Sequence, residues 1–305
     1  METPNRNDST HHYKLVVCVY ACATVEKYRD QIRSVRKTWG KLCNATLETA
    51  NSLSPIIRYL VTVPEDDVSS NENVNGTVKL LFFMGEEKTT DEFVGDEFVY
   101  LPDVQNDYLS ASYKQYLGLK HIYENYRFDF ILCCGTDTYL NIPKLVKHLD
   151  TYSPSESSYI GGHGCVRTLD NVDYHYHSGG PGFILSHECM KQLYPSLLPD
   201  LVTDWLRVCS ENNKNDLYGA CDVSISYYLQ KLNIHPRVIR LDGLQFTHCN
   251  YMGIPCHAGE IDITELMSCH LMSAVDFELY TKILYMNDFY VLGGTLVPPP
   301  PSYNL

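Results

Sequence analysis

The sequence predicts one α/β domain with a mostly parallel central sheet, and three features lead to this prediction. Short apolar runs alternate with segments of helical periodicity from residue 14 onward, which is the pattern of βαβ units. No repeat or long linker interrupts residues 13–290. Hydrophobic residues make up 44% and charged residues 20% of the 305 residues, as in ordinary globular proteins. We expect a single domain over 13–290, a disordered arm at 1–12 and a Pro-rich extended tail at 291–305.

The first expected elements are a buried strand and an amphipathic helix. Residues 14–21 (KLVVCVYA) are almost wholly apolar, as in a strand that is covered on both faces. Apolar residues then recur at steps of three and four over 25–39, which places them on one helical face. Gly40 supplies a stop for this helix. Two more apolar runs predict strands at 56–63 (IIRYLVTV) and 78–83 (VKLLFF).

The middle of the chain continues the alternation. Tyrosines and leucines at helical steps predict a long helix over 107–126. The apolar run 128–134 (FDFILCC) predicts the next buried strand. Asn141 and Pro143 then open a helix that extends to about residue 149, as an N-cap and a first-turn proline do.

Charge and composition exclude several classes of protein. Lys and Arg number 24 and Asp and Glu 37, which gives a net charge of −13 and argues against a general nucleic-acid binder. No apolar run approaches the roughly 18 residues of a membrane helix, and residues 1–12 lack the apolar stretch of a signal peptide. We expect a soluble chain. The 12 cysteines leave both reduced thiols and disulfides open.

Two carboxylates stand at the ends of expected elements. Asp137 follows the apolar run 128–134, and ligands in open α/β sheets bind at the carboxyl ends of strands. A carboxylate there suits a divalent cation that bridges phosphates, or else it caps a turn with Thr138. Asp222 lies in the first turn of a helix expected at 223–232, where it either complements the helix dipole or serves as a general base.

Two glycine clusters, 161–164 and 177–182, let the backbone approach a ligand closely or form tight turns. No GxGxxG follows the first strand, and no GxxxxGK[ST] occurs. Dinucleotide-dependent redox chemistry and P-loop phosphoryl transfer are therefore unsupported.

Six segments, in order over about residues 14–250, resemble motifs of the fringe and β1,3-galactosyltransferase superfamily. The run TWGKLCN at 38–44 looks most like the core 1 β1,3-galactosyltransferase branch. The six are RDQIRSVRKTWG at 29–40, FFMG at 82–85, DYLSASYK at 107–114, FILCCGTDTY at 130–139, YHSGGPGFILS at 176–186 and ACDV at 220–223.

This resemblance implies a GT-A fold and an inverting β1,3-glycosyltransferase. Such an enzyme moves a hexose (galactose or N-acetylglucosamine) from a UDP-sugar to a hydroxyl of a glycan or glycoprotein, with Mn²⁺ on the diphosphate. By resemblance, Asp222 is the catalytic base and Asp137 a metal ligand. A late histidine completes the metal site, with His248 as the first candidate and His257 as the second. The resemblance also implies that the protein acts in the Golgi lumen.

The resemblance also implies a nucleotide-sugar site at the end of the first strand, beside the basic helix and the glycine loop. The local positive charge of this helix suits a diphosphate in an otherwise acidic protein. Arg33, on the same helix, is expected on a solvated face. The expected contacts are Tyr20, Ala21, Arg29, Arg36, Lys37, Thr136, Asp137, Gly179 and Gly180.

The chain departs from the family at the acidic triplet, which is here Gly135-Thr136-Asp137, and at Cys221, which replaces the acid before Asp222. One interpretation is an active transferase, because both key carboxylates remain. The alternative is a non-catalytic relative that acts as a chaperone or binding module. Separately, Pro300–Tyr303 fits the PPxY pattern of WW-domain ligands, which would add a partner site.

Overall fold

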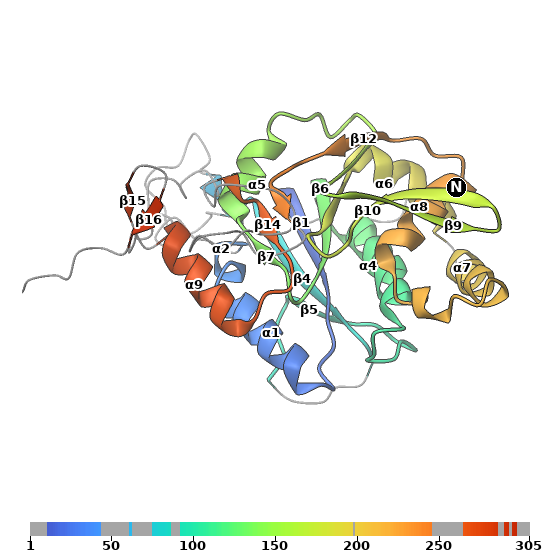
Figure 1. Ribbon diagram of the computed structural model, residues 1–305, viewed down its shortest axis with the longest axis horizontal. Coiled ribbons are helices and arrows are strands. Elements are labelled where there is room, and N and C mark those ends of the chain that lie inside the picture. Colours follow the sequence, from blue (N-terminus) through green and yellow to red (C-terminus); the bar gives the residue numbers. More distant parts are fainter. Residues whose placement is uncertain are drawn as a thin grey trace, which may run out of the picture.

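The computed structural model describes residues 11–43, 61–62, 75–86, 92–197, 199–245, 265–285, 290–292 and 295–297. Its centre is one seven-stranded sheet (Figure 1). The strands follow one another across the sheet in the order β12 (Arg237–Arg240), β8 (Ser158–Gly161), β11 (Phe183–Ser186), β6 (Arg127–Gly135), β1 (His12–Tyr20), β4 (Val78–Met84) and β5 (Phe98–Tyr100). Strand β11 runs antiparallel to β6 and β8, and the other neighbouring pairs are parallel.

Helices cover both faces of this sheet (Figure 1). One face carries α1 (Glu26–Lys37), α2 (Gly40–Cys43), α5 (Ile142–Leu149) and α9 (Ala274–Tyr285). The other face carries α4 (Ala111–Asn125), α6 (His187–Leu193), α7 (Pro199–Glu211) and α8 (Cys221–Lys231), with the short turns η2 (Tyr194–Ser196) and η3 (Asn215–Leu217).

Smaller pairings lie around the sheet. A hairpin leads into the glycine loop, and a three-stranded ladder joins the end of β6 to the late part of the chain. These elements are β9 (Gly164–Leu169) with β10 (Val172–His177), β7 (Tyr139–Leu140) with β13 (Leu244–Gln245) and β14 (Ser268–Cys269), β2 (Val61–Thr62) with β3 (Asn75–Gly76), and β15 (Tyr290–Leu292) with β16 (Thr295–Val297).

The alternation of side chains in β1 explains why the sheet needs two layers of helices. Leu15, Val17 and Val19 belong to one hydrophobic core, whereas Val16 and Cys18 belong to the other. Successive side chains of a strand point to opposite faces, so an unbroken apolar run must be covered on both. The predicted α/β class with a mostly parallel sheet is confirmed.

The expected helix over 25–39 is shorter than the periodicity indicates. Helix α1 ends at Lys37 because Thr38 leaves the helical region, with φ −115° and ψ −115°. Gly40 begins α2 and is not the stop. Trp39, between them, is fully buried and donates its indole N–H to the Thr138 carbonyl oxygen at 3.2 Å.

Several expectations fall partly or wholly outside the described residues. Of the strand expected at 56–63, only Val61–Thr62 is described, and it pairs with β3 rather than joining the central sheet. Residues 1–10 and the WW-type motif Pro300–Tyr303 are not described. Among the helices that the structure describes, none has the length and apolar character needed to cross a membrane.

Candidate active site

A pocket of about 350 Å³ opens at the carboxyl ends of β1 and β6. Strand ends, the glycine loop after β10, the first turn of α8 and the segment after β14 all contribute to its wall. It brings together most of the site residues that the sequence predicts. They are Tyr20, Ala21, Thr136, Asp137, Gly179, Gly180 and Asp222.

Asp137 faces a histidine in this pocket. The Oδ2 atom of Asp137 lies 3.4 Å from Nε2 of His270, and the two side chains are 27% and 17% exposed. Burial acts to raise the pKa of Asp137, but the hydrogen bond and charge of His270 outweigh it, so that the pKa lies below its ordinary value. The carboxylate is therefore ionised at neutral pH.

The small ladder of β7 and β14 brings these two residues together. Ser268 pairs with Leu140 and Cys269 with Tyr139, so the residue after β14 arrives beside the turn that holds Asp137. The Asp137 carbonyl oxygen also accepts a hydrogen bond from Met272 N at 3.0 Å. A contact between segments so distant in sequence depends on strand pairing.

The sequence analysis missed His270. His248 and His257, the two predicted late histidines, lie outside the described residues. No spacing motif marks His270, because it follows a strand of only two residues. The one available signal was that it is a further histidine late in the chain.

Asp222 stands in the first turn of α8 and is held by two backbone groups. Its Oδ2 accepts a hydrogen bond from Gly179 N at 2.8 Å, and its Oδ1 accepts one from Val223 N at 2.9 Å. Burial raises the pKa of Asp222, and these hydrogen bonds offset only part of that effect. A carboxylate with a raised pKa is a better proton acceptor, as a general base requires.

Gly179 and Gly180 separate the two functional groups. A Cβ on Gly179 would lie 2.9 Å from Cβ of Asp222, and one on Gly180 would lie 2.3 Å from Nδ1 of His270. Two hydroxyls hold this loop, since Thr138 Oγ1 donates to the Gly180 carbonyl at 2.7 Å and Ser268 Oγ donates to that of Pro181 at 2.6 Å. The glycines therefore give the aspartate and the histidine the space they occupy.

The pocket wall also contains a buried cation, Lys114. Its ammonium donates to the Ala21 carbonyl oxygen at 2.8 Å and approaches that of Asp107 at 3.5 Å. Burial lowers its pKa. Lys114 is the only Lys or Arg among the described residues that line the pocket. It lies in the motif at 107–114, yet the sequence analysis did not single it out as a site residue.

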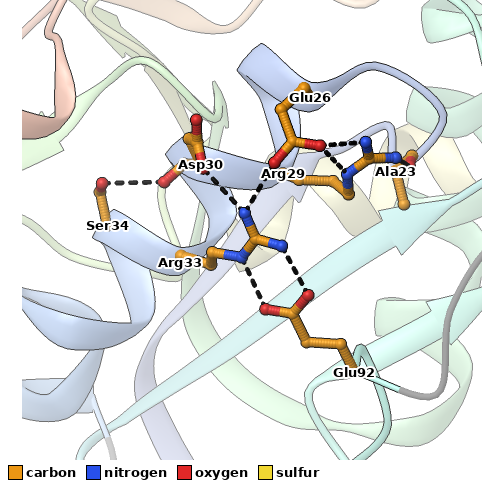
Figure 2. A network of polar contacts seen from close by, with 7 residues as sticks. All are labelled: Ala23, Glu26, Arg29, Asp30, Arg33, Ser34 and Glu92. Carbon is orange, nitrogen blue, oxygen red and sulfur yellow. Dashed lines mark hydrogen bonds and ion pairs between the residues drawn. The ribbon is translucent and has the colours of Figure 1, made fainter.

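The basic residues of α1 lie outside the pocket lining. Acidic side chains pair with Arg29 and Arg33 (Figure 2). Arg29 donates to Glu26 and to the Ala23 carbonyl oxygen, the latter at 2.9 Å. Arg33, which was expected on a solvated face, donates two hydrogen bonds to Glu92, each at 2.7 Å. It also pairs with Glu26 and Asp30, at 3.0 and 2.8 Å.

The other two expected contacts of α1 are similarly placed. Arg36 pairs with Glu97 at 3.2 Å, and Lys37 is exposed at the helix end. The structure thus brings neither these two nor Arg29 to the pocket. Thr136 does line it, but its hydroxyl donates to the buried side chain of Gln31 at 2.7 Å, which leaves its oxygen as an acceptor.

The residues at the carboxyl end of β6 include two groups that are suitable ligands for a divalent cation. A carboxylate oxygen and an imidazole nitrogen are suitable ligands, and the 3.4 Å between Asp137 and His270 is close to the separation of two ligands on one ion. Within the described ranges no group of three or more His, Cys, Asp or Glu gathers around one point. Water or substrate oxygens would complete the coordination, as they commonly do when phosphates are bound.

Comparison with known proteins identifies a family over the middle of the chain. Residues 103–242 match the family described as Fringe-like. This region of the chain is Fringe-like. It contains Asp137, the glycine loop and Asp222, whereas β1 and His270 lie outside it. The Fringe-like match confirms the superfamily that the motifs indicated, and it supports a glycosyltransferase.

Among solved structures, the chain is similar to the crystal structure of mouse xyloside xylosyltransferase 1 in its apo form. The sequences are 11% identical, the match covers 85% of this chain and 97% of that chain, and the TM-score is 0.38.

Proposed function

We propose that the protein is an inverting β1,3-glycosyltransferase that moves a hexose from a UDP-sugar to a hydroxyl of a glycan or glycoprotein. The observation that carries the proposal is one pocket that holds both Asp137 with His270 and the half-buried Asp222. Anionic leaving-group stabilisation and proton removal are the two requirements of this reaction.

On the donor side, Asp137 and His270 would hold Mn²⁺, which when bound supplies positive charge for the oxygens of the leaving diphosphate. Lys114 adds a protein cation in the same wall. Tyr20 and Ala21, at the end of β1, line the part of the pocket assigned to the nucleotide. Thr136 offers a hydroxyl oxygen that can accept a hydrogen bond from ribose.

On the acceptor side, Asp222 takes a proton. The acceptor oxygen forms a bond to the anomeric carbon while the bond from that carbon to the diphosphate oxygen breaks, and UDP leaves with the electron pair. The acceptor proton goes to the Asp222 carboxylate. The hydrogen bonds from Gly179 N and Val223 N fix the direction of that carboxylate, so that it is oriented before substrate arrives.

The reduced acidic triplet is compatible with this chemistry. Gly135 has no side chain to hold ribose, yet the remaining carboxylate, Asp137, is the one that meets His270. Cys221 fills the place of the acid before Asp222, and burial raises the pKa of its thiol well above the ordinary value. Cys221 is therefore a neutral wall residue beside the base.

The test is release of UDP when the chain is incubated with Mn²⁺, UDP-galactose or UDP-N-acetylglucosamine, and a panel of simple glycosides. We expect turnover with at least one pair, and Mn²⁺-dependent thermal stabilisation by UDP. Asp137→Asn should weaken UDP binding about tenfold or more. Asp242→Asn is the matched control, because its side chain is 77% exposed and does not line the pocket.

The non-catalytic alternative makes a different set of predictions. A chaperone or binding module would show no turnover with any donor and no thermal shift with UDP and Mn²⁺. That combined result would overturn the proposed function. UDP binding without turnover would show that the protein has a nucleotide-binding site but is not a transferase for the sugars and glycosides tested.

A further inference from the structure

An aromatic side chain stands at the mouth of the pocket. Tyr108 lines the pocket, and 61% of the residue is exposed to solvent. Burial raises the pKa of its hydroxyl, and the negative charges of Asp222 and Asp137 add to this effect. Tyr108 therefore lines the same pocket as Asp222 and Asp137 while much of its surface faces solvent.

The backbone holds Tyr108 in place just before α4. Ser110 N donates to Oδ1 of Asp107 at 2.8 Å, and Ala111 N donates to the Tyr108 carbonyl oxygen at 3.1 Å. The ring rests against Gly219, since a Cβ there would lie 2.9 Å from ring atoms Cδ1 and Cε1 and 2.4 Å from the Tyr108 carbonyl oxygen. A ring fixed in this way loses little conformational freedom when a ligand covers it.

Exposed aromatic surface beside polar groups suits one class of ligand. A sugar ring presents an apolar C–H face, which packs on an aromatic ring, and hydroxyls at its edge, which bond to nearby polar groups. Tyrosine combines a broad apolar face with a polar tip, and aromatic side chains of this kind commonly line ligand pockets. Tyr28 of α1 also lines this pocket, so aromatic side chains from two segments of the chain contribute to its wall.

We infer that Tyr108 is the platform on which the acceptor sugar stacks, with Asp222 beside the attacking hydroxyl. This inference rests on the proposed function. The acceptor, rather than the donor, is assigned because Asp137 and His270, which we assign to the diphosphate, are less exposed than Tyr108, and a glycan chain must enter from solvent. Tyr108 is then a specificity residue for the acceptor and takes no proton itself.

The experiment compares Tyr108→Ala and Tyr108→Phe with the neighbouring control Leu109→Ala. Leu109 is 50% exposed but does not line the pocket. Initial rates are measured against acceptor glycoside and, separately, against UDP-sugar. Transfer to water and the UDP–Mn²⁺ thermal shift serve as donor-side readouts.

We expect Tyr108→Ala to raise the KM for the acceptor about tenfold, as the loss of one aromatic contact does. The donor KM, transfer to water and the thermal shift should stay within about twofold, since the donor-side residues are unchanged. Tyr108→Phe should remain near wild type because it keeps the ring. An unchanged acceptor KM, or a raised donor KM, overturns the inference.

A direct binding measurement separates this inference from the proposed function. Glycosides are titrated into the UDP-saturated protein by calorimetry. If wild type binds a glycoside without transferring sugar to it, the proposed function fails, and Tyr108→Ala must still weaken that Kd for the platform to hold. If wild type binds UDP but neither binds nor glycosylates any glycoside, both are overturned.

Discussion

Helix α1 and the pocket use charge in opposite ways. On α1, Arg33 faces three acidic side chains, Glu26, Asp30 and Glu92 (Figure 2). In the pocket, Asp137 faces the imidazole of His270, and Asp222 is held by backbone N–H groups. The arginines of the helix are thus paired with carboxylates of the fold, whereas the carboxylates of the pocket are held by an imidazole and by backbone N–H groups.

The contrast shows what a basic motif in a sequence does and does not predict. Arginines repeated along one helix indicate local positive charge, but acids from distant segments, such as Glu92 and Glu97, cancel much of it. Surface pairs of this kind contribute little to stability. A titratable group in a pocket, with a pKa shifted by burial, is a better indicator of a functional site than a paired surface arginine.

The largest expected effect is on kcat and comes from a substitution in the pocket. Asp222→Asn should lower kcat by about 10²- to 10⁴-fold, which is the usual contribution of a general base. UDP affinity should be nearly unchanged, because we assign Asp222 to the acceptor side. Asp216→Asn, at an exposed site outside the pocket, is the control. Turnover that survives Asp222→Asn would exclude this residue as the base.

His270→Ala should come next. Removing the imidazole leaves Asp137 as the one protein ligand that we assign, and Mn²⁺-dependent UDP affinity should fall about 10- to 100-fold. His175→Ala, at an exposed position of β10, should have no effect. Calorimetry with UDP, with and without Mn²⁺, measures this, and equal affinities for both variants would place the cation elsewhere.

The pH dependence sharpens the assignment of the base. Because the pKa of Asp222 is raised, the carboxylate accepts a proton at a higher pH than an ordinary aspartate does. We expect kcat to fall about tenfold per pH unit on the acid side, beginning above the ordinary aspartate pKa of about 4.

Folding stability changes with pH in the opposite direction to kcat: the contribution of Asp222 to stability is lost as the pH rises. A carboxyl with a raised folded pKa contributes stability below its unfolded pKa and loses that contribution as the pH rises through the folded pKa.

For the kcat–pH profile, UDP–Mn²⁺ binding measured over the same pH range distinguishes protonation of the base from loss of the metal site. A kcat that stays flat down to about pH 4 contradicts the assignment.

The smallest effect should come from the helix. Arg33→Ala removes several surface ion pairs, and such pairs are weak and screened by salt. UDP affinity should change by less than about twofold, and thermal stability should fall only slightly, less so at high salt. A loss of UDP affinity like that of His270→Ala would show that α1 does contact the nucleotide.

Sequence reasoning predicted those features that local pattern controls. The strands β1, β4 and β6 are apolar runs, and Asp137 and Asp222 stand at the ends of elements whose periodicity is plain. An element's end is a local property, so these two carboxylates could be placed in advance.

The rest depends on contacts between distant segments. His270 reaches Asp137 only because β14 pairs with β7, and a strand of two residues leaves no periodic trace. The partner of Arg36, Glu97, was equally invisible, since periodicity gives the face of a helix but not what packs against it. Gly179 and Gly180 were predicted to approach a ligand, and the structure shows which side chains they approach.

The adjacency of Gly179 and Gly180 links the fates of the two halves of the site. Gly179 packs closely against Asp222 and Gly180 against His270, and a single peptide bond joins the two glycines. A loop shift that spoils one alignment must therefore disturb the other. In a lineage released from selection for transfer, a substitution in this loop would impair nucleotide binding and transfer in one step, whereas a change at Asp222 alone would impair only transfer.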